Sequence, residues 1–103
     1  MSENISKQIR SEVTKESKLL LYIESTEIPE PKKDEVLIRI EASPINPSDL
    51  GLLIGPADVS SMSVSGEGEA AVVTMDIPQG LLRMLETRLD QSLPVGNEGG
   101  GVV

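Results

Sequence analysis

The sequence predicts a mainly β domain with one or two short helices. Residues 35–42 alternate between apolar and polar side chains, and Val36, Ile38 and Ile40 point the same way. This alternation, with β-branched residues on the apolar side, is typical of a strand with one buried face. Glycine and proline interrupt the chain between its other apolar segments, which favours short elements joined by turns.

The hydrophobic core is expected to be small and aliphatic. The chain has 103 residues, of which 38% are hydrophobic, and it contains no Phe or Trp. Tyr22 is the single aromatic residue. A domain of this length buries only about 60–65% of its unfolded surface.

Two further strands are expected before the clearest one. Residues 7–13 alternate weakly around Ile9 and Val13, and residues 19–28 carry apolar side chains on both faces until Pro29 ends them. We expect the strands at 19–28 and 35–43 to pair in an antiparallel manner across the intervening connection.

A short helix is expected to begin at Asn46. Asn46 suits the N-cap, Pro47 suits the first helical position, and Asp49 places a negative charge in the first turn. Residues 55–56, Gly-Pro, end this helix.

The second half of the chain is harder to interpret. Its serine-rich part within residues 56–80 suggests a mobile loop, with a strand at 70–74. Beyond it, four leucines share one helical face and are expected in the core: Leu81, Leu82, Leu85 and Leu89.

Charge and composition exclude several classes of function. The net charge of −8 and the single aromatic residue argue against nucleic acid as a partner. The chain has no Cys and no His, which excludes disulfides, a Cys nucleophile and a His general base, and argues against a zinc site. No apolar run is long enough to cross a membrane, so a cytoplasmic location is expected.

Two segments carry a family resemblance. Residues 34–49 have the sequence DEVLIRIEASPINPSD, and residues 94–103 have the sequence PVGNEGGGVV. Together they resemble the medium-chain dehydrogenase/reductase family. In that family a strand of the form xEVLIRVxA leads to a short helix ending in Asp, and Gly-His-Glu-Gly-x-Gly-x-Val follows some tens of residues later.

The departures from this pattern indicate a branch of the family. Zinc-dependent members have Cys where Asn46 stands and His where Asn97 stands, and a neutral amide is a poor zinc ligand. The chain therefore resembles the zinc-independent quinone and enoyl reductases, in which hydride passes directly from NADPH or NADH to a quinone or an electron-poor C=C bond.

The resemblance implies roles for a few residues and assigns none as catalytic. Asn46, Pro47 and Ser48 would approach the nicotinamide end of the cofactor. The substrate pocket would include Asn46, Asp49, Asn97 and Glu98. Each of these also has a purely structural interpretation, such as a helix cap for Asn46 or a backbone hydrogen bond for Glu98.

The family places a GroES-like β-barrel before a Rossmann domain that binds the cofactor. The resemblance thus implies that residues 1–103 are a partial GroES-like barrel, truncated near Val102 and Val103, with the Rossmann domain absent. We expect the isolated chain to be inactive, to bind no nicotinamide cofactor and to hold no zinc.

Other interpretations remain open. A barrel of this length could be a co-chaperonin-like ring subunit, with residues 56–80 as its mobile loop, or a module that only dimerises. Exposed strand edges near Val95, Val102 and Val103 predict a homodimer. Native mass distinguishes a ring from a monomer or a dimer.

Overall fold

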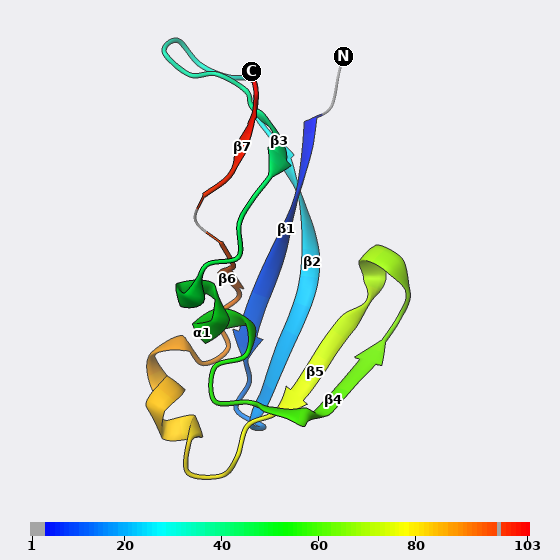
Figure 1. The fold of residues 1–103 in the computed structure, drawn as a ribbon, viewed down its shortest axis with the longest axis vertical. Coiled ribbons are helices and arrows are strands. Elements are labelled where there is room, and N and C mark those ends of the chain that lie inside the picture. Colours follow the sequence, from blue (N-terminus) through cyan, green and yellow to red (C-terminus); the bar gives the residue numbers. More distant parts are fainter. Residues whose placement is uncertain (1–3, 97) are drawn as a thin grey trace.

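The computed structural model describes residues 4–96 and 98–103, and its main feature is an open five-stranded sheet (Figure 1). All neighbouring strands in it are antiparallel, in the order β4-β5-β2-β1-β6. In chain order these strands are β1 (Asn4–Val13), β2 (Lys18–Ile28), β4 (Asp58–Ser65), β5 (Val72–Asp76) and β6 (Leu93–Pro94).

The long β1–β2 hairpin organises the molecule. Its register places Val13 opposite Leu19 near the turn and Ile9 opposite Ile23 farther along. Val13 and Leu19 are buried, whereas Ile9 and Ile23 are exposed. Successive side chains of a strand point to opposite faces, so one apolar face runs along the hairpin, covered at the turn end and uncovered at the other.

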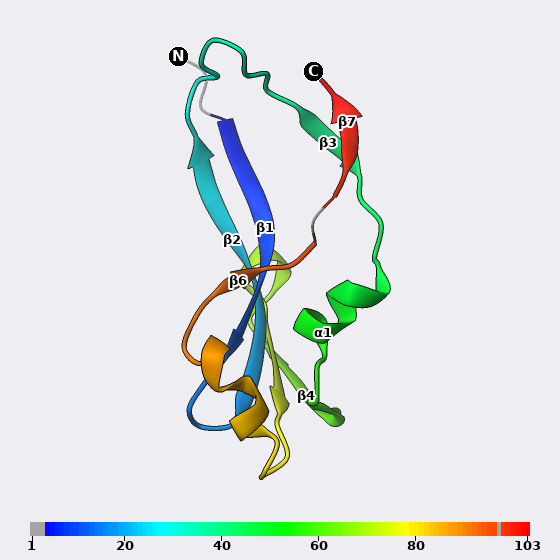
Figure 2. The same ribbon diagram turned by 90° about the vertical axis from the view of Figure 1, so that its left-hand side faces the viewer.

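A second, two-stranded sheet stands apart from the hairpin (Figure 2). It pairs β3 (Arg39–Ala42) with β7 (Gly100–Val102) in an antiparallel manner. The expected pairing of the strands at 19–28 and 35–43 is therefore wrong: β2 pairs with β1 and β5.

A tight turn accounts for this difference. The Glu35 N–H donates to the Lys32 carbonyl at 3.0 Å, and the Glu35 carboxylate accepts from the Lys32 N–H at 2.9 Å. Asp34 takes a left-handed φ of 71° within this turn. The turn reverses the chain well beyond the end of β2, so the chain reaches β3 on a separate path. The half-buried strand expected over residues 35–42 is wrong in its start and its burial: β3 begins at Arg39, and Val36, Ile38 and Ile40 are exposed because this part of the chain belongs to a two-stranded sheet only.

The helices are short. The 3₁₀ turn η1 (Pro47–Asp49) continues into α1 (Leu50–Leu53), as expected from the capping residues. Two further 3₁₀ segments are η2 (Gly68–Ala70) and η3 (Leu82–Arg88). None of the helices in the described part of the chain is long and apolar enough to cross a membrane.

The prediction of a mobile loop over residues 56–80 is wrong, because most of this segment forms the β4–β5 hairpin. The serine side chains hid this strand, because they gave no clear apolar alternation. The strand expected at 70–74 is present as β5, displaced by two residues.

The core lies where the turn end of the β1–β2 hairpin meets β5 and η3. Its buried members are Val13, Leu19, Met75 and Ile77, and the predicted leucines Leu81, Leu82, Leu85 and Leu89 pack against them. The prediction of a mainly β domain is confirmed, and the open sheet corresponds to a partial rather than a closed barrel.

Candidate functional site

At the start of the helix that follows Asn46, residues Asn46 and Asp49 hydrogen-bond to each other. The Asn46 backbone N–H donates to Oδ2 of Asp49 at 2.8 Å, and the Asp49 N–H donates to the Asn46 carbonyl at 2.9 Å. Asp49 is only 6% exposed. Its carboxylate therefore holds the backbone of Asn46 in place, which is the structural role expected for a first-turn acid.

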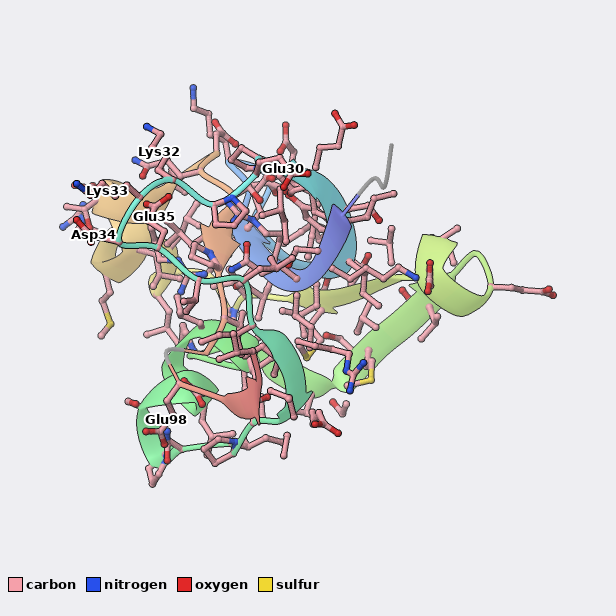
Figure 3. The ribbon with its side chains drawn as sticks, turned by 90° about the horizontal axis from the view of Figure 1, so that it is seen from above. Glu30, Lys32, Lys33, Asp34, Glu35 and Glu98 are labelled. Atoms are coloured by element: carbon pink, nitrogen blue, oxygen red, sulfur yellow. The ribbon has the colours of Figure 1, made fainter. Side chains whose placement is uncertain are left out.

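The side chain of Asn46 reaches the second motif segment. Its Nδ2 donates to Oε1 of Glu98 at 2.9 Å, across 52 positions of the sequence. Figure 3 shows Glu98 beside the short helix. The contact uses one of the two N–H groups of the amide, and among the described residues the second N–H has no partner.

The structure thus brings together three of the four residues expected in a substrate pocket. Asn46 is half-buried, Asp49 is buried behind it, and Glu98 is exposed in front. Asn97, the fourth, lies outside the described residues. Over residues 4–96 and 98–103, no group of three or more His, Cys, Asp or Glu side chains is arranged to hold a metal ion.

A buried polar contact that the sequence analysis missed anchors the C-terminal end of this helix. Ser11 of β1 is fully buried, and its hydroxyl donates to the Leu52 carbonyl. Arg88 of η3 donates through Nη2 to the Ser11 hydroxyl at 2.8 Å and through Nη1 to the Gly51 carbonyl at 3.4 Å. Terminal carbonyls of a helix need such partners, and a cation there also complements the helix dipole.

Burial has an electrostatic consequence for Arg88. Desolvation lowers the pKa of its guanidinium below the ordinary value of an arginine. The sequence signal for this contact was Ser11 itself, a polar residue between Ile9 and Val13 on the apolar face of its strand.

A second cluster anchors the segment that leads to Glu98. Arg10 donates through Nε to the Ser92 hydroxyl at 2.9 Å, and the Tyr22 hydroxyl contacts the same oxygen at 2.5 Å. Glu24 lies 3.3 Å from Arg10 Nε and balances its charge. Tyr22 is thus a partly buried strand residue, as its position in the sequence indicated.

Strand β1 therefore supports both parts of the site. Arg10 and Ser11 are neighbours in the chain, and their side chains leave the strand on opposite faces. Ser11 holds the helix that begins after Asn46, and Arg10 holds Ser92, close before Glu98 in the sequence. Small shifts of β1 would move both segments together.

The residues expected near a nicotinamide cofactor lie at the start of the helix. Pro47 and Ser48 are exposed at the start of the helix, next to the half-buried Asn46. The pyrophosphate of such a cofactor is normally held by a glycine-rich turn leading into a long helix. The described residues contain no such element, because α1 has only four residues.

Comparison with models of protein families and with curated proteins found no match to this chain.

Proposed function

We propose that this chain is the substrate-side domain of a zinc-independent, NAD(P)H-dependent reductase that acts on quinones or electron-poor C=C bonds. The observation that carries the proposal is the 2.9 Å hydrogen bond from Asn46 to Glu98. It brings into contact the two segments whose motifs resemble that family, although 52 positions separate them in the sequence.

The amide of Asn46 can supply what such a reaction needs in the absence of a Lewis acid. When bound, the reduced nicotinamide would supply a hydride to the ring or to the β-carbon of the acceptor, and water would supply the proton that completes the reduction. Negative charge would develop on the carbonyl oxygen of the acceptor before that proton is taken up. The second Nδ2–H of Asn46 is suited to donate to that oxygen, and loss of one such donor typically slows a reaction by about 10²–10³.

Glu98 would act as a positioning residue. By accepting one N–H of the Asn46 amide, its carboxylate fixes the rotation of the amide plane and so directs the other N–H. Asp49 and Glu98 also make this site negative, which favours neutral acceptors such as quinones and enones over anionic ones.

The proposed activity also needs a domain that holds the rest of the cofactor. The residues described here can contact the nicotinamide end alone, so hydride transfer requires a nucleotide-binding domain in addition. The isolated chain is expected to bind acceptors weakly and to turn nothing over.

An NMR titration tests the proposal. Adding 2-cyclohexenone or menadione to the ¹⁵N-labelled chain should shift the side-chain amide signals of Asn46 and the backbone signal of Glu98. The Asn46→Ala variant should lose the shift of the Glu98 backbone signal, and Gln79→Ala, which removes an exposed amide elsewhere, should retain it. Shifts confined to other regions, or the same response in Asn46→Ala, would contradict the proposal.

A further inference from the structure

The folded chain exposes more surface than its size requires. Its accessible surface is 7468 Å², whereas a compact monomer of this mass exposes about 5,600 Å². Its radius of gyration is 15.9 Å, against about 13 Å for a compact domain of this length. The excess of about 1,800 Å² exceeds the roughly 800 Å² that each partner buries in a standard protein interface.

Part of the exposed apolar surface gathers at one end of the molecule. We call it the distal groove, a hollow of about 450 Å³ between the open end of the β1–β2 hairpin and the β3–β7 sheet. Val103 is 85% exposed there, and Ile5 is 57% exposed. Its lining residues are Ile5, Ile28, Leu37, Ile38, Arg39, Val102 and Val103.

A charged turn adjoins the groove. A second hollow, lined by Ile28, Leu37 and Glu35 among others, connects the groove to the turn at residues 32–35. This turn carries Lys-Lys-Asp-Glu, and Figure 3 shows its four side chains close together at one side of the molecule. Among the described residues, none of the four forms an ion pair within the chain.

We propose that a second copy of this chain covers the distal groove, with a two-fold axis passing beside the turn. In a two-fold interface, a contact from residue i to residue j is repeated from j to i. Lys33 and Asp34 are adjacent at the tip of the turn, so the same axis pairs Lys33 of each copy with Asp34 of the other. The turn is thus complementary in charge to itself.

The apolar residues supply most of the stability of this dimer, and the ion pairs set its register. Exposed ion pairs contribute little to the stability of an interface, whereas burial of a Val or Ile side chain contributes considerably more. The opposite signs on the turn also disfavour arrangements that bring like charges together. The proposal is independent of the proposed hydride transfer.

Sedimentation velocity over a range of concentrations tests the proposal. The chain is expected to be a dimer at high-micromolar concentration. Val103→Asp should raise the dissociation constant by about tenfold or more, because each interface loses two buried valines. Met84→Asp adds the same charge at a 73% exposed residue of η3 and should leave the constant unchanged.

The charged turn has its own matched pair of variants. Lys33→Glu should weaken the dimer, while Arg83→Glu, the same charge change at an exposed residue of η3, should not. Val103→Asp and Met84→Asp both alter exposed residues, and circular dichroism should show that both variants are folded. A monomer at high-micromolar concentration, a larger ring, or equal effects of Val103→Asp and Met84→Asp would each overturn the proposal.

Discussion

Ser11 of β1 and Arg88 of η3 lie 77 positions apart and are joined by a 2.8 Å hydrogen bond from Nη2 of the arginine. Together they bind the Gly51 and Leu52 carbonyls at the end of the helix that begins after Asn46. This contact couples the small core to the candidate site, because it fixes the helix whose first residues carry the site.

Arg88→Met is expected to loosen that helix. It removes the 2.8 Å hydrogen bond to Ser11 and the longer, weaker 3.4 Å contact with the Gly51 carbonyl, and a hydrogen bond from a charged group contributes about 1.5–3 kcal/mol. We predict a loss of about 2 kcal/mol in the free energy of unfolding, measured by urea denaturation. Arg83→Met, at an exposed residue of η3, should change the free energy of unfolding little. An equal loss there would refute the role of Arg88.

Asp49→Ala should destabilise the start of the helix that follows Asn46. It removes the acceptor for the Asn46 N–H, and loss of a helix cap costs about 0.5–2 kcal/mol. Asp49→Asn keeps a side-chain oxygen in the same place and should retain most of the stability. Amide hydrogen exchange of residues 46–53 measures this, and equal protection in Asp49→Ala and the unaltered chain would show that the cap is dispensable.

Gly101→Ala is expected to separate β7 from β3. A Cβ atom at residue 101 would collide with the Arg39 carbonyl oxygen, so the two backbones could not approach as they do. NMR should then show loss of the backbone contacts between Arg39 and Val102. Gly100→Ala is the control, because a Cβ atom there meets nothing within 4 Å. Intact pairing in Gly101→Ala would contradict the observed approach.

The isolated chain is expected not to bind NADPH measurably. The element that normally holds the pyrophosphate, a glycine-rich turn at the start of a long helix, does not occur in the described residues. A fluorescence titration should therefore show no saturation in the micromolar range. A dissociation constant of a few micromolar would mean that this chain contains a complete cofactor site.

The sequence predicted which segments form strands and helices better than it predicted which strands pair with each other. The alternation after Glu35 and the capping residues Asn46 and Asp49 are local signals. They predicted the helix start and a strand in this part of the chain, but the strand begins only at Arg39 and its apolar side chains are exposed. The pairing of β3 with β7 depends on contacts between residues far apart in the chain, which local patterns do not contain. The turn at 32–35 shows this most clearly, because Asp34 takes a left-handed φ that no flanking residue indicates.

The candidate site was predictable in part for the same reason. The motifs named Asn46, Asp49 and Glu98, and the structure brings these three together. The residues that support them were not predicted, because Ser11, Arg10 and Arg88 act through contacts across the fold. Ser11 was the one detectable exception, since a serine on an apolar strand face must find a hydrogen-bond partner when buried.

Hydride transfer in a fusion protein tests the central claim most directly. The nucleotide-binding half of a zinc-independent quinone reductase would follow Val103, and the fusion would receive NADPH deuterated at C4 together with an enone. We predict deuterium at the β-carbon of the product, unaffected by a chelator and reduced about 10²-fold or more in Asn46→Ala. A folded fusion that binds NADPH yet transfers no deuterium, or that needs zinc to do so, would contradict the account.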